Sequence, residues 1–375
     1  MCMATMVTEP AGELQFLRPE ALIDLAAARH NLNCARTAAP CSRVIAVIKS
    51  NAYGHGMLRI AQALDEADAF GLSRMEEAVR LRQAGFEQRL IVLEGFFGSD
   101  ELEAASHYQV ELAVNGWEQL LLLEKSQLQQ QVTCWLKVDT GMHRLGFPPA
   151  EAARAHRSLE NCISVRPPIR LMTHLANADD LQDSATDCQM QLFLPLISQL
   201  GGEISIANSA ALLGWPQTHY DWVRPGIMLY GASPLLGGTG EKHELKPVMT
   251  LSSRLIAVNQ CQSGDRVGYG GGWRCPEPMP VGVVAIGYGD GYPRHAPSGT
   301  PLLVNGSRVP LIGRVSMDMV TVDLRSQPQA KVGDPVILWG RGLPVEVIAQ
   351  AAGTISYELL CSVSQRVRFI EEGFG

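Results

Sequence analysis

The stretch Val-Ile-Ala-Val-Ile-Lys-Ser-Asn-Ala-Tyr-Gly-His-Gly, residues 44–56, decides the fold. Its five apolar residues, most of them β-branched, predict a buried strand that ends at Lys49. In parallel α/β proteins the carboxyl ends of the strands carry the chemistry, and a desolvated lysine there favours the neutral amine that forms a Schiff base. The following turn offers the phenol of Tyr53, and Gly54 and Gly56 permit close backbone approach, which indicates a phosphate-binding turn. A lysine that merely leaves a strand for solvent is the alternative.

Similar apolar runs recur at even spacing through the first two-thirds of the chain. The eight runs are Val44–Ile48, Ala69–Leu72, Leu90–Leu93, Val110–Val114, Cys134–Val138, Ile169–Met172, Ile204–Ala207 and Val223–Met228. Helical spacing over Arg74–Ala84, Gly116–Lys125 and Gln189–Leu200 separates several of them, although Pro195 argues against the last helix. Strands that alternate with helices predict a (β/α)8 TIM-type barrel. A doubly wound sheet is the alternative, but no Gly-rich dinucleotide fingerprint follows the first strand.

The pattern changes near Lys246–Pro247, where short strands separated by Gly, Pro, Asn and Ser turns replace the helical periodicity. The predicted strands are Met249–Asn259, Arg266–Tyr269, Val281–Ile286, Leu302–Val304, Val309–Ile312, Val320–Leu324 and Val336–Leu338. Asn305–Gly306 lies between two of them and is a strong hairpin signal. We therefore expect a disordered lead-in over residues 1–17, a barrel domain over 18–247 and a mostly antiparallel β domain over 248–375.

Composition excludes several classes of protein. The chain has 375 residues, 46% of them hydrophobic and 18% charged, which is enough for a large core. The net charge of −7 argues against a nucleic-acid surface, and no apolar run of about 18 residues predicts a membrane span. The first residues do not resemble a secretory signal, and the nine cysteines lack metal-binding spacing. We therefore expect a cytoplasmic protein with reduced thiols and no metal site.

Polar residues that follow the predicted barrel strands are expected to meet at one end of the barrel. They are Lys49, Arg144, His174, Asn208, Ser209 and Arg224. A ring of such residues fits an active-site mouth above an apolar barrel core. Taken singly, His174 also fits a core histidine, and Arg224 also fits a surface ion pair. Lys137 and Asp139 lie two residues apart on a strand and share a face, so a lysine–aspartate pair is one way to accommodate Lys137.

The segment from Lys49 to Gly56 resembles the cofactor lysine motif of bacterial alanine racemases, which use pyridoxal 5'-phosphate (PLP). The resemblance continues in order through Asp139–Gly146, Thr173–His174, Asn208–Ser209, Val223–Gly226, Gly268–Gly271, Gly287–Gly291, Ser316–Met319 and Ser356–Glu358. It covers roughly residues 18–370.

The resemblance assigns roles to individual residues. It implies that Lys49 binds PLP and serves as one catalytic base, and that Tyr269 from the partner of a head-to-tail homodimer is the second base. Arg144 would hold the substrate carboxylate, while Met317 and Tyr288 of the partner would complete the substrate site and its entrance. The remaining cofactor contacts would be Tyr53, His174, Asn208, Ser209, Arg224, Gly226, Ile227 and Tyr357. Lys137 would be carbamylated, and its negative charge would orient Arg144.

Arg224 also bears on how strongly the bound cofactor would withdraw electrons. An arginine is always charged and has no acceptor, so beside the pyridine nitrogen of PLP it favours the unprotonated ring. The electron sink is then weaker, which suits the removal and return of one proton and suppresses transamination.

The predicted function is therefore the interconversion of L- and D-alanine by PLP and two bases, for peptidoglycan supply or for alanine catabolism. A serine/alanine racemase of broader specificity is one alternative, because a pocket discriminates a small added group by only about 1–3 kcal/mol. A PLP decarboxylase of the same barrel type would need a cysteine-bearing motif that the chain lacks. A non-catalytic PLP-carrier barrel would lack the β domain.

Overall fold

A computed structural model describes residues 19–373, so the predicted lead-in over residues 1–17 lies outside the described residues. The chain forms two compact units. The barrel unit comprises Ala21–Leu251, Trp339–Val363 and residues 369–373, and the β unit comprises residues 19–20, Ser252–Leu338 and Ser364–Arg368. The predicted single boundary at residues 247 and 248 stays a prediction. Among the described residues, no helix is both long and apolar enough to cross a membrane.

Eight parallel strands close into a barrel, which confirms the predicted TIM-type fold. In order around the barrel they are β2 (Arg43–Val47), β3 (Ala69–Leu72), β4 (Arg89–Val92), β5 (Val110–Val114), β6 (Val132–Lys137), β7 (Val165–Met172), β8 (Ile204–Asn208) and β9 (Trp222–Arg224). Pairing of Val44 in β2 with Val223 in β9 closes the ring. The strands are buried on both faces, as parallel strands covered by helices must be.

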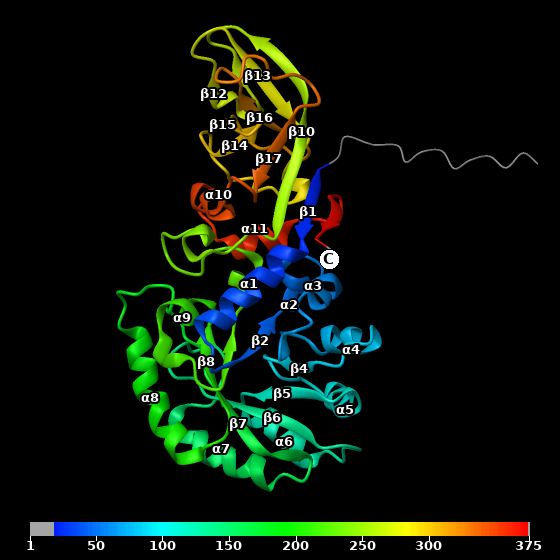
Figure 1. Ribbon diagram of the computed structural model, residues 1–375, viewed down its shortest axis with the longest axis vertical. Helices are drawn as coiled ribbons and strands as arrows, with labels where there is room; N and C mark the ends of the chain where they lie inside the picture. The colour runs from blue at the N-terminus through cyan, green and yellow to red at the C-terminus, as the bar shows by residue number, and fades with distance from the viewer. Residues whose placement is uncertain (1–18, 374–375) are drawn as a thin grey trace, which may run out of the picture. The chain divides into compact units, whose positions relative to one another are not determined.

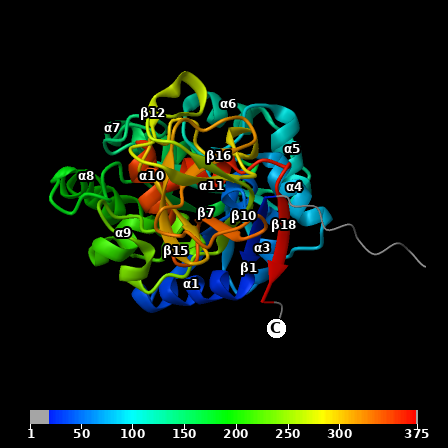
Figure 2. The same ribbon diagram turned by 90° about the horizontal axis from the view of Figure 1, so that it is seen from above.

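Helices surround the barrel strands, as Figures 1 and 2 show for this unit. They are α1 (Leu25–Ala38), α3 (Met57–Ala63), α4 (Met75–Gln83), α5 (Ser99–Tyr108), α6 (Trp117–Lys125), α7 (Pro149–Asn161), α8 (Ala185–Leu200) and α9 (Ser209–Gly214). Two later helices, α10 (Val345–Ala352) and α11 (Ser356–Ser362), also belong to the barrel unit. A short α2 (Lys49–Tyr53) follows β2 directly.

Residues from seven of the eight strands meet in the barrel core. The cluster consists of Ile45, Ala69, Ile91, Ala113, Trp135, Met172 and Trp222, all at most 1% exposed. The small side chains of Ala69 and Ala113 leave room for Trp135 and Trp222, whose rings meet edge to face with 6.2 Å between their centres. The barrel interior is therefore a packed core, and the chemistry belongs to its ends.

The last barrel strand is shorter than predicted. β9 ends at Arg224, and Ile227–Tyr230 forms a 3-10 turn instead of continuing the strand. Pro225 has no backbone N–H and cannot take part in a ladder beyond Arg224, so the predicted strand Val223–Met228 is wrong in its second half. The doubt raised by Pro195 is also wrong, because α8 continues through it.

The β unit contains an antiparallel sheet. Six neighbouring strands of this sheet run in the order β13 (Met279–Val284), β16 (Val320–Asp323), β15 (Ser307–Ile312), β14 (Pro301–Val304), β17 (Pro335–Trp339) and β10 (Met249–Cys261). The predicted hairpin is confirmed, since β14 and β15 pair with Asn305 and Gly306 both at positive φ. The remaining strands are β1 (Glu20–Asp24), β11 (Arg266–Val267), β12 (Trp273–Arg274) and β18 (Arg368–Glu372).

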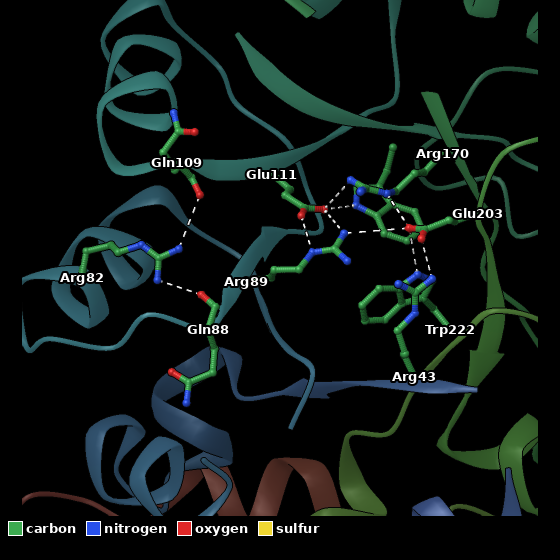
Figure 3. A network of polar contacts seen from close by, with 10 residues as sticks. Arg43, Arg82, Gln88, Arg89, Gln109, Glu111, Arg170, Glu203 and Trp222 are labelled. Carbon is green, nitrogen blue, oxygen red and sulfur yellow. Dashed lines mark hydrogen bonds and ion pairs between the residues drawn. The ribbon is translucent and has the colours of Figure 1, made fainter. Parts of the chain in front are cut away.

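Five charged side chains form a network at the amino ends of the barrel strands, shown in Figure 3 and here called the basal cluster: Arg43, Arg89, Glu111, Arg170 and Glu203. Trp135 and Trp222 donate their indole N–H groups to its two carboxylates.

Candidate active site

One cavity of about 640 Å³ lies in the barrel unit, and residues that follow the barrel strands supply most of its polar lining. It brings together eleven of the residues that the sequence predicts for the site: Lys49, Tyr53, Lys137, Arg144, His174, Asn208, Ser209, Arg224, Gly226, Ile227 and Tyr357. The residues predicted to meet at the carboxyl ends of the strands therefore do line one cavity, while the roles of the individual residues stay predictions.

Lys49 stands between strand β2 and an unusual turn. Ser50, Asn51, Ala52 and Tyr53 all have left-handed φ angles of 50–55°. Such a run is costly for residues with a Cβ, by about 1–2 kcal/mol each, so surrounding contacts must hold it. Side chains hold its start and its end: Ser50 N donates to Glu77 Oε1 at 2.8 Å, and Asn51 Oδ1 accepts from the Met57 N–H at 2.9 Å.

His55 braces the same turn from behind. Its Nδ1 contacts the carbonyl oxygens of Ala52 and Tyr53 at 3.0 and 2.9 Å, and because carbonyls only accept, Nδ1 carries the proton. The imidazole is fully buried against Tyr230, which in turn stacks on Tyr53 at 4.6 Å. Burial lowers the pKa of His55 to about 4, so the ring is neutral at neutral pH.

Helix α11 packs on the turn from the other end of the sequence. A Cβ at Gly54 would lie 2.2 Å from the carbonyl oxygen of Leu360, and Gly54 also has a φ of 81°, so this position requires glycine. The Tyr357 ring lies 5.8 Å from the Tyr53 ring. The phenol of Tyr53 is therefore held by aromatic neighbours from two distant segments.

Gly226 forms the floor of the cavity beside Tyr53. A Cβ here would lie 2.5 Å from the Tyr53 phenol oxygen, so any larger residue would displace that oxygen. The Gly226 N–H donates to Ser209 Oγ at 2.7 Å, and Ile227 follows on the cavity wall. Hydroxyls and an open backbone thus converge on one small area, as a phosphate site requires. Asn208 begins α9 and accepts from the Ala211 N–H.

Arg224 is buried and rigidly held. Its Nη1 donates to Ser205 Oγ at 2.6 Å, and its Nη2 donates to the carbonyl oxygens of Thr173 and Ile206 at 2.7 and 3.0 Å. Nη2 also lies 3.3 Å from His174 Nδ1. Because a guanidinium only donates, a hydrogen bond across this contact requires His174 Nδ1 to be unprotonated. Burial, followed by Arg224 and the other cations, lowers the pKa of His174 well below its usual value, in agreement with a neutral ring.

The cavity is strongly cationic. Lys49, Lys137, Arg144 and Arg224 line it, and Glu94 is the carboxylate among its lining residues. Burial and the neighbouring cations lower the pKa of Lys137 to about 8. The cavity therefore favours anionic ligands, which fits both a phosphate and a carboxylate.

Lys137 does not use Asp139 as its partner. Its Nζ lies 3.4 Å from the Leu93 carbonyl oxygen, while Asp139 Oδ1 accepts from the N–H groups of Gly141 and His143 at 3.0 Å each. Asp139 instead shapes the loop that carries Arg144 into the cavity. No group of three or more His, Cys, Asp or Glu side chains in residues 19–373 is arranged to hold a metal ion.

Three predicted site residues belong to the β unit. Tyr269, Tyr288 and Met317 are 74%, 39% and 52% exposed in this chain. Tyr269 opens a short turn between Gly268 and Gly270, both at positive φ. Their assignment to the site stays a prediction.

Glu94 and Cys361 are among the lining residues that sequence analysis did not assign to the site. The carboxylate of Glu94 lies 3.8 Å from Lys49 Nζ. Glu94 directly follows the predicted strand Leu90–Leu93, so the criterion that found Lys49 could have found it. Cys361 lies one helical turn after Tyr357 on α11, and no sequence signal points to it.

Comparisons with known proteins follow the same division of the chain. The profile of the alanine racemase N-terminal domain matches residues 23–234, and that of the alanine racemase C-terminal domain matches residues 248–371. Alanine racemase of Nitrosococcus oceani is 53% identical over 349 residues, which are 93% of this chain and 98% of that protein. The biosynthetic alanine racemase of Escherichia coli is 51% identical over 347 residues, 92% of this chain and 97% of that protein.

Solved structures of alanine racemases superpose on this chain over nearly its whole length. The biosynthetic alanine racemase of Pseudomonas aeruginosa superposes with a TM-score of 0.93 at 43% identity, covering 96% of this chain and all of that one. Alanine racemase of Bartonella henselae with covalently bound pyridoxal phosphate has a TM-score of 0.84 at 29% identity, covering 95% and 99% of the two chains.

The chain has the fold of a TIM-type barrel protein, with a cavity lined by Lys49 and other cationic side chains at the carboxyl ends of the barrel strands. Together with these matches over nearly the whole length of the chain, this fold shows that the chain belongs to the alanine racemase family, a family of isomerases.

Proposed function

We propose that the chain is a PLP-dependent alanine racemase, acting as a cytoplasmic homodimer that supplies D-alanine for peptidoglycan. The single observation that carries the proposal is the cavity in which Lys49, Arg224 and the Gly226 floor meet. The biosynthetic names of two close relatives favour the supply role over alanine catabolism.

The cavity residues fit PLP. Gly226 lacks the Cβ that would fill the space at Tyr53, and Ser209 and Ile227 complete a site for a phosphate. Lys49 would hold the aldehyde carbon, and the donor-only guanidinium of Arg224 would face the ring nitrogen. Bound PLP would supply a sink for the electron pair that remains when the substrate Cα loses its proton.

The chain's own groups would move the proton. Lys49 Nζ would exchange a proton with one face of Cα, and the phenol of Tyr269 of the partner subunit would exchange one with the opposite face. Arg144 would bind the substrate carboxylate with its guanidinium fork. Met317 of the partner subunit would complete the substrate site, and Tyr288 of the partner subunit would narrow its entrance.

The proposal is tested by incubating the purified protein with PLP and either L-alanine or L-serine, followed by chiral chromatography. Formation of D-alanine with much slower formation of D-serine is the expected result. Comparable rates for both would favour the broader serine/alanine racemase. Retention of PLP without conversion of either amino acid would favour a PLP carrier and contradict the proposal.

A further inference from the structure

A buried glutamine on helix α8 reaches the cavity wall from outside. Gln189 is 3% exposed, and its Nε2 donates to Thr140 Oγ1 at 3.1 Å and to the His174 carbonyl oxygen at 3.0 Å. Its Oε1 accepts from the Ala176 N–H at 2.8 Å. Because the carbonyl only accepts and the backbone N–H only donates, the orientation of the amide is fixed, and both of its N–H groups are used.

This amide starts a one-way chain of hydrogen bonds. Thr140 Oγ1 and Thr173 Oγ1 lie 2.9 Å apart, and Thr173 Oγ1 donates its single proton to the Val138 carbonyl oxygen at 2.9 Å. Thr173 must therefore accept from Thr140, which leaves Thr140 as the acceptor of the Gln189 N–H. Each group therefore donates to the next: Gln189 to Thr140, Thr140 to Thr173, and Thr173 to the Val138 carbonyl oxygen. The two hydroxyls are 3% and 1% exposed, so water does not readily replace a lost partner.

The chain joins the loop that carries Arg144 to the end of β7, which Arg224 contacts. Thr140 belongs to the loop that continues to Arg144, and the Thr173 carbonyl oxygen accepts from Arg224 Nη2 at 2.7 Å. The same loop packs directly on Gln189, since a Cβ at Gly141 would lie 3.3 Å from Gln189 Cγ. One side chain on α8 thus fixes the loop of Arg144 relative to the end of β7.

We propose that Gln189 is a positioning residue that sets the orientation of Arg144 and thereby the affinity of the site for the substrate carboxylate. This inference rests on the proposed function, because it assumes that Arg144 binds that carboxylate. Arg144 contacts the carboxylate before and during proton transfer alike. Its displacement therefore weakens binding and leaves the turnover number nearly unchanged.

The test replaces the amide and keeps its shape. Gln189→Glu can still accept from Ala176 but, when ionised, donates to neither Thr140 nor His174. Gln189→Met removes all three bonds without introducing a charge. Gln191→Glu is the matched control, since it makes the same change on the exposed side of the same helix. Propionate serves as the probe, because it has a carboxylate but no amino group.

We expect both Gln189 variants to raise KM for alanine and the calorimetric Kd for propionate about fivefold, which corresponds to the net contribution of one hydrogen bond, about 1 kcal/mol, with kcat within about threefold of wild type. Thr140→Val should give a smaller increase in the same direction, and its effect should not add to that of Gln189→Met, because both break one chain. Gln191→Glu should match wild type.

Unchanged KM and propionate affinity in a folded Gln189→Met protein would overturn the inference. So would a fall in kcat and in bound PLP with no increase in KM, which would show a merely structural role. If wild type itself neither converts alanine nor binds propionate, the proposed function fails instead.

Discussion

Gly226 shows how one missing methyl group can control the site. A Cβ at Gly226 would lie 2.5 Å from the Tyr53 phenol oxygen, far inside van der Waals contact. Tyr53 cannot simply retreat, because Tyr230 stacks on one side of its ring and Tyr357 lies against it. The added methyl group would therefore move the phenol or push the Gly226 backbone away from Ser209.

We expect Gly226→Ala to weaken PLP binding at least tenfold while the barrel remains folded. The measurement is the equilibrium binding of PLP to the cofactor-free protein, followed by absorbance. Gly98→Ala is the matched control, because a Cβ at Gly98 meets nothing within 4 Å. Equal PLP affinity in the two variants would show that Gly226 does not border the phosphate.

Two lysines in the cavity compete as targets for the aldehyde of PLP. Burial and nearby cations lower the pKa of Lys137 to about 8, so it offers a substantial fraction of neutral amine. Lys137 is 7% exposed, whereas the side chain of Lys49 is 34% exposed. We predict that borohydride reduction followed by peptide mass spectrometry places the pyridoxyl group on Lys49. Label on Lys137 would reverse the assignment of the two lysines.

At the scale of elements, the left-handed turn after β2 depends on its neighbours. Of its four residues only Asn51 readily adopts positive φ, and the structure supplies Glu77, His55 and helix α11 to hold the turn. His55 stabilises the turn only while its imidazole is neutral, because a charged ring would be buried without solvent. The turn therefore couples the geometry of the site to the protonation of His55.

The lowered pKa of His55 makes the protein sensitive to mild acid. The folded-state pKa is about 4, below the usual 6.5, so the unfolded chain binds the proton more readily between these values. Stability from this group is fully present above pH 6.5 and decreases as the pH falls toward 4. We expect about 2 kcal/mol less stability at pH 5 than at pH 7.5 from this group alone.

The check is urea unfolding of wild type and His55→Asn at both pH values. Asparagine keeps a donor near the position of Nδ1 but does not titrate, so the variant should lose less stability on acidification. His107→Asn, at an exposed position on α5, is the control. The same acid loss in wild type and in His55→Asn would exclude His55 as its source.

The elements that sequence analysis predicted well are those whose pattern is local. The predicted helical stretch Arg74–Ala84 contains α4, and Asn305–Gly306 is a hairpin turn, because helical periodicity and two-residue turn chemistry act within a few residues. The strand Val223–Met228 was predicted too long because its apolar run hid the effect of Pro225. The left-handed run at Ser50–Tyr53 had no local signal, since contacts with α4 and α11 impose it.

At the scale of the whole molecule, the barrel has two specialised ends. The carboxyl ends of its strands hold the cavity, and the basal cluster occupies the amino ends (Figure 3). Two glutamates offset two of the three arginine charges there, and Arg43 and Arg89 also lie 4.2 and 4.5 Å from the Trp222 ring. Burial would raise the pKa of Glu203, but hydrogen bonds from Arg43, Arg170 and Trp222 outweigh it and lower this pKa.

We predict that Glu203→Gln lowers stability by roughly 1–3 kcal/mol and leaves KM for alanine unchanged. Removal of one carboxylate leaves Arg170 and Arg43 short of a partner at a half-buried place far along the strands from the cavity. Urea unfolding and steady-state kinetics measure the two effects. Glu103→Gln, at an exposed position on α5, controls for the loss of one negative charge. A changed KM with unchanged stability would contradict this separation of the two ends.

Complementation tests whether the proposed homodimer shares its sites. Lys49→Ala and Tyr269→Ala proteins should each be inactive, and after subunit exchange about half of the dimers should be mixed. Each mixed dimer would hold one site with both residues intact, so about a quarter of wild-type activity should return. Verified exchange without recovered activity would mean that both residues act from one chain, or that Tyr269 is not the second base.

Sequence analysis recovered the barrel class because eight strands repeat one signal, and it recovered the cavity because its residues follow those strands. It did not find Gln189, whose importance depends on three partners in two other segments. It also did not find the basal cluster, because charges at strand starts resemble ordinary surface charges until the barrel closes. Residues that act through distant partners are those that a single sequence conceals.

The packing of α11 on the left-handed turn after Lys49 has a consequence for folding during synthesis on the ribosome. Lys49 emerges early from the ribosome, but Tyr357 and Leu360, which hold the turn around it, are translated about 300 residues later. At roughly 5–20 residues per second, the nascent chain carries an incomplete pocket for tens of seconds. On the proposed function, PLP would be bound only when synthesis is almost finished, and premature termination products with a complete set of barrel strands would lack the contacts that hold the lysine turn.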